Sequence, residues 1–250
     1  RAHIGRGYVA AELGQWERAN DFFKLGEELI FSYTDRWAAR FYAKAAEAAL
    51  QTNELDRARQ LADRTGSYSE RRPSEDAALV LARLAEIKEG PEEAYKRYVG
   101  LTRDVSEPVA VQAELYKLDL GVKIGKISPL EAADQLEALR FRWRGDDVEM
   151  QTVGILADQY MRLGRFREAL MLAQSAALRE PDARGARELR LRLMEYFRQL
   201  YLEGEADRLD PIQALALFYE FKALTPIGPD GDLMIRKLAR RLVAFDLLDP

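Results

Sequence analysis

Apolar side chains recur along this chain at the spacing of a helix rather than that of a strand. Residues 41–50, with the sequence FYAKAAEAAL, are mostly strong helix formers. The alternation of polar residues with Val, Ile and Thr that marks a half-buried strand is hardly present. The pattern therefore predicts an all-α protein in which helices run through almost the whole chain.

Glycine, proline and asparagine cut this pattern into segments of roughly 12 to 20 residues, the length of ordinary helices. The breaks fall at Gly14, Thr52–Asn53, Arg72–Pro73, Gly90–Pro91, Glu107–Pro108, Ser128–Pro129, Gly145–Asp146, Gly164, Pro181, Asp210–Pro211 and Pro226–Pro229. Pro91, Pro129 and Pro211 also mark helix starts, because the missing N–H of proline is harmless in a first turn. Ser128 and Asp210 precede two of them as N-caps.

One small residue recurs in every second segment and would let that helix approach its neighbour closely. These residues are Ala19, Ala58, Ala94, Ala132, Ala169 and Ala214, at intervals of 39, 36, 38, 37 and 45 positions. A near-constant period of this size is typical of stacked helical hairpins. The sequence thus predicts a solenoid of about six antiparallel helix hairpins. The longest interval predicts extra residues or longer helices near Glu203–Asp210.

The stretch Val153–Pro181 contains one complete repeat unit. Its marker residues are Leu156, Ala157, Tyr160, Gly164, Phe166, Ala169, Ala173, Ala176 and Pro181. Much of the same pattern occurs earlier, at Gly7, Ala10, Gly14, Trp16, Ala19, Phe23 and Gly26. This pattern resembles that of the tetratricopeptide repeat (TPR) family, whose unit is a pair of antiparallel helices of about 34 residues.

Weaker matches within Tyr42–Thr65, Ala78–Leu101 and Leu120–Leu139 extend the resemblance over nearly the whole chain. The intervals exceed the repeat length of the family, which implies TPR-like hairpins with longer helices or loops. The resemblance implies a TPR-like superhelix, and we expect one array over residues 1–250. Because the chain opens on Arg1 and stops at Pro250, we also expect it to be a piece of a longer protein.

Composition narrows the classes of function that the chain can serve. It is 48% hydrophobic and 32% charged, which suits a folded protein with a large core. With a net charge of −4 and a pI of about 5.4, it has no general attraction to nucleic acid. The absence of cysteine excludes disulfides and thiol chemistry, and suits the cytoplasm and the periplasm equally. No apolar run of roughly 18 residues exists, so we expect no direct membrane insertion.

The residues that could carry catalysis or hold a metal do not form a recognisable site. His3 is the one histidine, which excludes multi-histidine metal sites. The carboxylate pairs Glu27–Glu28, Glu92–Glu93 and Asp146–Asp147 suit helix starts, where acids complement the helix dipole. The acids of Gly228–Asp232 fall short of a calcium loop and favour a turn before a helix. We therefore expect no cofactor, no metal and no enzymatic activity.

Arginine alternates with aromatic residues at Arg140–Phe141–Arg142–Trp143–Arg144. Such a stretch can clamp nucleic acid, but three acids follow it within five residues and offset its charge. We favour the end of a helix, where arginine complements the C-terminal dipole. A patch for an anionic partner is the alternative.

In TPR-like stacks, which the chain resembles, the first helices of the units line a concave groove. The side chains opposite the packed small residues would face that groove, and the set is mixed in charge. The predicted partner-binding residues are Arg40, Lys44, Glu47, Gln51, Arg83, Gln151, Asp158 and Arg162. The Lys and Asn set with which some family members clamp a C-terminal carboxylate is absent, so binding of chaperone tails is not expected.

These observations lead to one main hypothesis about function and to alternatives. The main hypothesis is a non-enzymatic scaffold that binds a peptide or protein surface in its concave groove, or assembles with itself. The alternatives are a structural spacer or assembly domain of a larger envelope or secretion machine, and the regulatory part of an enzyme whose catalytic domain lies elsewhere.

Overall fold

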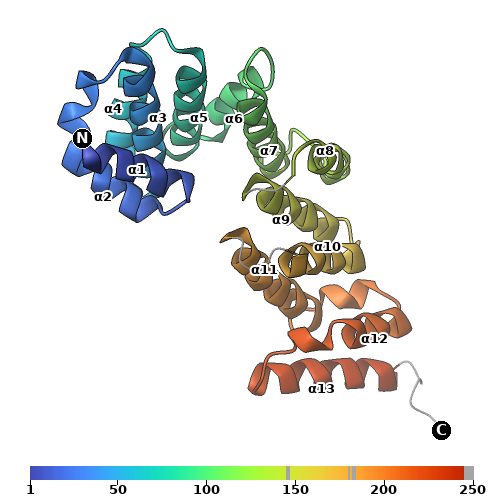
Figure 1. The fold of residues 1–250 in the computed structure, drawn as a ribbon. Coiled ribbons are helices and arrows are strands. Elements are labelled where there is room, and N and C mark those ends of the chain that lie inside the picture. Colours follow the sequence, from blue (N-terminus) through green and yellow to red (C-terminus); the bar gives the residue numbers. More distant parts are fainter. Residues whose placement is uncertain (145–146, 180, 182–183, 245–250) are drawn as a thin grey trace. The chain divides into compact units, whose positions relative to one another are not determined.

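The computed structural model describes residues 1–144, 147–179, 181 and 184–244. Within these ranges the chain forms thirteen α-helices and three short 3-10 helices, and no strand (Figure 1). The predicted all-α repeat fold is therefore confirmed. The predicted break at Gly145–Asp146 lies outside the described residues. The chain divides into two compact units, Arg1–Lys126 and Ile127–Pro250, and the prediction of one array over residues 1–250 stays a prediction.

Unit 1, Arg1–Lys126, contains three helix pairs and one further helix, α7. Its elements are α1 (Ala2–Glu12), α2 (Trp16–Gly26), η1 (Glu27–Ser32), α3 (Asp35–Gln51), α4 (Leu55–Thr65), α5 (Arg71–Lys88), α6 (Pro91–Gly100) and α7 (Glu107–Lys123). The helices of each pair pack against each other, and α1, α3, α5 and α7 also pack side by side in that order. The first helices thus form one continuous layer of the unit.

Unit 2, Ile127–Pro250, contains the remaining helices. They are α8 (Pro129–Arg142), α9 (Asp147–Arg162), α10 (Phe166–Arg179), α11 (Arg184–Tyr201), η2 (Glu205–Arg208), α12 (Pro211–Glu220), η3 (Lys222–Leu224) and α13 (Pro229–Ala244). Here α9 packs against α8, α10 and α11, and α13 packs against α11 and α12. The insertion of η2 accounts for the long last interval, as the sequence predicts for Glu203–Asp210.

The turns that follow α1, α3, α5, α7, α9 and α11 share a residue with positive φ. These residues are Gly14, Asn53, Gly90, Gly125, Gly164 and Gly204. After Gly14, Asn53, Gly125 and Gly164, the amide of the next residue donates a hydrogen bond of 2.8 Å to the carbonyl five residues before it. One example is the bond from Glu54 N to Ala49 O. Glycine and asparagine adopt positive φ at little cost, and such a bond caps the preceding helix. The six turns confirm about six repeat units.

The helix starts have the capping residues and prolines that the sequence predicts, and the helices approach each other at the predicted small residues. The side chain of Ser128 accepts a hydrogen bond from Glu131 N at 3.1 Å, and that of Asp210 accepts one from Ile212 N at 2.9 Å. Proline occupies the first turns of α6, α8 and α12. All six small residues, Ala19, Ala58, Ala94, Ala132, Ala169 and Ala214, are fully buried. A larger side chain there would separate the helices.

Candidate functional site

The open face of α3 is a narrow stripe. From Ala38 to Gln51, the residues that are not buried are Arg40, Lys44, Glu47 and Gln51. Their spacing of three and four residues places them on one side of the helix. The other positions are mostly alanine and pack against neighbouring helices on every other side. The structure therefore brings together four predicted partner-binding residues on one surface, which we call the α3 stripe.

Lys44 lies at the centre of the α3 stripe and is held by two carboxylates. Its Nζ lies 3.2 Å from Oε1 of Glu12 on α1 and 3.1 Å from Oε2 of Glu47. Burial alone would lower the pKa of Lys44, but the charges of Glu47 and Glu12 outweigh it and raise that pKa above its ordinary value. Lys44 thus stays charged and joins α1 to α3.

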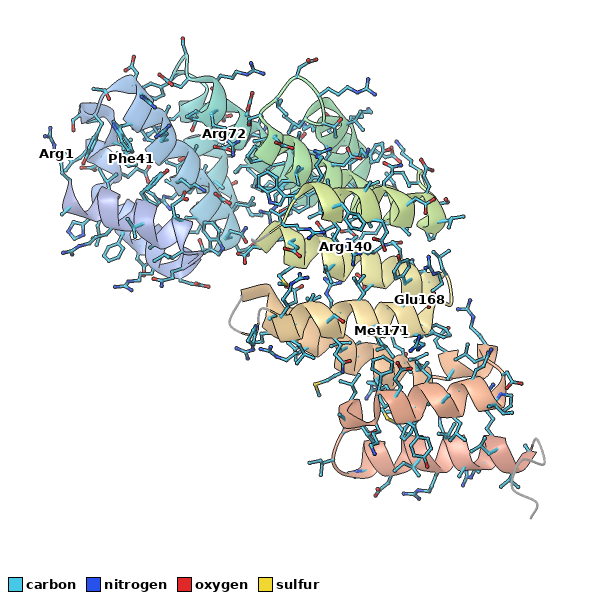
Figure 2. All side chains as sticks on the ribbon, turned by 45° about the vertical axis from the view of Figure 1, so that its right-hand side comes forward. Arg1, Phe41, Arg72, Arg140, Glu168 and Met171 are labelled. Atoms are coloured by element: carbon cyan, nitrogen blue, oxygen red, sulfur yellow. The ribbon has the colours of Figure 1, made fainter. Side chains whose placement is uncertain are left out.

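A second ionic group lies on α5, the helix next to α3 in the layer of first helices, and includes Arg72, which is labelled in Figure 2. Arg72 Nε lies 3.0 Å from Oδ1 of Asp76, and Arg72 Nη1 donates to Ser106 Oγ at 2.7 Å. Burial raises the pKa of Asp76, with Arg72 and Lys44 opposing that shift and Glu47 adding to it. The α3 stripe and the Arg72–Asp76 pair are therefore close enough to influence each other electrostatically.

An aromatic cluster extends the α3 stripe by one turn toward its N-terminus. The Trp37 ring stacks on Phe41, with centroids 5.5 Å apart, and Tyr8 contacts both rings edge-on. Arg40 lies over Trp37, with Cζ 5.3 Å from the ring centroid. Trp37 remains 44% exposed although its neighbour Phe41 is buried. The predicted site missed Trp37, which the same helical spacing would have included three residues before Arg40.

Arg83, the predicted site residue on α5, belongs to a separate group of aromatic and charged side chains. Its Cζ lies 5.3 Å from the ring centroid of Tyr116 on α7. The Tyr98 hydroxyl donates to Glu86 Oε2 at 2.9 Å, and the rings of Tyr98 and Tyr116 are 5.5 Å apart. Burial and the charge of Glu86 raise the pKa of Tyr98. Arg83 thus helps to hold α5 against α7.

The open face of α9 in unit 2 repeats the geometry of the α3 stripe. Of its residues, only Asp147, Gln151, Asp158 and Arg162 escape burial, so three predicted site residues lie where expected. Asp158, however, already has partners within the unit. Both Arg192 and the Tyr196 hydroxyl, on α11, donate to its carboxylate. Asp158 therefore holds α9 to α11, while Gln151 and Arg162 are exposed.

The remaining candidate residues have structural surroundings. His3 lies against Phe22, with ring centroids 6.1 Å apart. Glu27–Glu28 and Glu92–Glu93 lie in first helical turns, as does Asp147, whereas Asp146 lies outside the described residues. Asp230 is in the first turn of α13 and pairs with Arg198 at 3.2 Å. Helix α8 ends at Arg142, which confirms that the arginine-rich stretch is a helix end.

The described residues contain no group of three or more His, Cys, Asp or Glu side chains placed to hold a metal ion. None of the described helices combines the length and the apolar character that crossing a membrane requires.

Comparisons with known proteins support the fold. No family model matches the sequence, and neither does any curated protein. Among solved structures, the chain is similar to a signal transduction ATPase with numerous domains (STAND) protein with a tetratricopeptide repeat sensor from Pyrococcus horikoshii. The TM-score is 0.63 at 17% identity, over 100% of this chain and 39% of that one. The likeness concerns the fold alone and supports a TPR-like helical repeat.

Proposed function

We propose that the chain is a non-enzymatic scaffold that binds a protein or peptide, and that unit 1 binds it through Trp37 and the α3 stripe. The observation that carries the proposal is the exposed stack of Trp37 and Arg40 on a buried aromatic base. Tryptophan, tyrosine and arginine contribute most to binding energy in protein interfaces. A rigid aromatic residue that is half-exposed on packed neighbours loses little conformational entropy on binding.

Charge pairing indicates which residues of the α3 stripe would contribute affinity and which would contribute specificity. Lys44 and Glu47 are already paired with each other and with Glu12, so a partner gains little by contacting them. Ion pairs that are partly open to water contribute about 0–1 kcal/mol. Trp37 and Arg40 therefore carry affinity in this proposal, whereas Lys44, Glu47 and Gln51 restrict which side chains fit beside them.

The test is selection of binding peptides from a displayed library, followed by measurement of Kd for the purified chain and two variants. Trp37→Ala should weaken an enriched peptide about tenfold or more, and Arg40→Glu should weaken it without removing the ring. Tyr219→Ala is the matched control, because Tyr219 is an aromatic residue of unit 2 that is 63% exposed. Equal loss in Trp37→Ala and Tyr219→Ala, or no enriched peptide, would count against the proposal.

Self-assembly is a second candidate function, favoured by an open cavity of about 630 Å³ on α1 and α2. Residues Ala2, Arg6, Val9 and Phe22 line it, and the residues 39 positions later are Phe41, Ala45, Ala48 and Leu61. Those later residues are buried in one core cluster with residues of the preceding helix pair. The cavity thus has the lining that one helix pair presents to another, and we propose that a second copy of this chain covers it.

Sedimentation at increasing protein concentration tests this second candidate. The average mass should rise with concentration, and Val9→Glu should abolish the rise. Leu25→Glu is the control, because Leu25 is exposed on α2 and does not line the cavity. A monomer at every concentration would exclude self-assembly through this face.

A further inference from the structure

Three arginines from separate parts of unit 2 converge on a cavity of about 170 Å³ that plays no part in the proposed docking surface. Arg140 comes from the last turn of α8, Arg144 from the segment after it, and Arg179 from the end of α10. Ser175, Glu149, Val153, Leu172 and Ala176 complete the lining. The cavity is more than ten times the roughly 15 Å³ that holds one water molecule, so a tetrahedral oxyanion fits.

The charges of this lining do not cancel. Glu149 is the one carboxylate that lines the cavity, and it pairs with Arg179. Arg140 pairs with Glu137 of its own helix at 3.0 Å, which leaves further N–H donors of its guanidinium. Among the described residues, no carboxylate lies within ion-pair distance of Arg144, whose Cζ is 5.6 Å from the Phe141 ring centroid. A small cleft in which one sign of charge predominates concentrates ions of the other sign.

A helix-end role explains only part of this arrangement. Arginine in the last turns of α8 and α10 complements the helix dipoles, whatever direction the side chains take. That effect does not account for three arginines that line one cavity together with Ser175. A shared anionic ligand would account for it, because forked N–H donors bind phosphoryl oxygens in pairs.

We propose that this cavity binds a phosphoryl group, with Arg144 and Arg140 as its principal donors and Arg179 and Ser175 at its margin. Free phosphate and a phosphorylated side chain of a peptide share this chemistry. The site is independent of the proposed scaffold function, since it lies in unit 2 and uses none of the residues of the α3 stripe.

The test is an NMR titration of arginine Nε–Hε signals with inorganic phosphate at constant ionic strength. Saturable shifts are expected with phosphate and not with chloride. Arg144→Ala should weaken binding about tenfold or more, because it removes charge-assisted hydrogen bonds. Arg144→Lys should fall between it and the unchanged chain, since lysine keeps the charge but not the fork.

Arg142→Ala is the matched control, because Arg142 is exposed two residues away and does not line the cavity. It should change binding less than about twofold, since only a general attraction is lost. Equal weakening by Arg144→Ala and Arg142→Ala would overturn the proposal, and so would shifts that chloride reproduces. The same titration is repeated with a phosphoserine peptide. If the peptide binds more tightly than free phosphate, the phosphoryl group that the cavity recognises belongs to a phosphorylated protein.

Discussion

The hydroxyl of Tyr196 on α11 donates a hydrogen bond to Oδ1 of Asp158 on α9, while Arg192 occupies the other oxygen of the same carboxylate. Tyr196 is 5% exposed, so its hydroxyl has little access to water. Burial and the nearby Asp158 raise the pKa of Tyr196 above its ordinary value. This three-residue contact fixes the first helices of two successive pairs to each other within unit 2.

Loss of the Tyr196 hydroxyl should destabilise unit 2 measurably. Tyr196→Phe keeps the ring and removes one hydrogen bond, so we expect a loss of about 1 kcal/mol in the free energy of unfolding. Asp158→Ala should cost more, about 2–3 kcal/mol, because it leaves the buried Tyr196 hydroxyl without its acceptor and removes one of the two carboxylates that Arg192 contacts. Urea denaturation measures both. Tyr219→Phe, at an exposed ring, should leave stability unchanged; a comparable loss there would contradict this account.

Helical spacing predicted which side of α3 and of α9 is open, because burial around a helix follows its period. It did not predict that Asp158 is already bound, since Arg192 and Tyr196 lie 34 and 38 residues away on another helix. The same limit applies to Arg179, which joins Arg140 and Arg144 at one cavity only through the packing of α8, α9 and α10.

Turn and cap positions, by contrast, were predictable because they depend on local chemistry. Gly14 and Asn53 are residue types that tolerate positive φ, and Ser128 and Asp210 cap helices through their own neighbours. Trp37 was predictable in its position but not in its contacts. Its spacing from Arg40 was visible in the sequence, but its stacking on Phe41 depends on how α1 packs against α3.

The left-handed turn at Gly125 should not accept an ordinary side chain. Its φ is +73°, and a Cβ built there meets nothing within 4 Å, so a substitution tests the backbone alone. Gly125→Ala should cost about 1–2 kcal/mol. Gly100 also has open space but lies at the end of α6 without positive φ, so Gly100→Ala should be neutral or stabilising by up to about 1 kcal/mol. Equal effects of the two changes in urea denaturation would refute the backbone explanation.

The close contact at Ala169 should exclude larger side chains. Ala169 on α10 is fully buried, at one of the six small positions that set the repeat. Ala169→Leu forces α10 and its neighbours apart, with an expected loss of about 1–3 kcal/mol. Ala138→Leu makes the same change at an exposed position of α8 and should be nearly neutral. Thermal unfolding of both variants checks this, and a stable Ala169→Leu protein would show that the position has spare room.

Acid should weaken unit 1 through Glu75. Its Oε2 accepts from Ser106 N at 2.9 Å, and its Oε1 accepts from Arg71 Nε at 2.8 Å. Burial alone would raise the pKa of Glu75, but the hydrogen bonds from Ser106 and the pairing with Arg71 outweigh it and hold that pKa below its usual 4.5. The unfolded chain therefore binds the proton more readily than the folded chain does.

Glu75 accordingly contributes stability that is fully present above about pH 4.5 and is lost as the pH falls through its folded pKa. Glu75→Gln keeps an acceptor for Ser106 N but does not titrate. The difference in unfolding free energy between the unchanged chain and Glu75→Gln should be constant near neutral pH and should shrink below about pH 4.5. Denaturant titrations from about pH 3 to about pH 7, in steps of about one pH unit, measure this difference. If unfolding free energy depends on pH in the same way for the two proteins, the carboxylate of Glu75 has no depressed pKa.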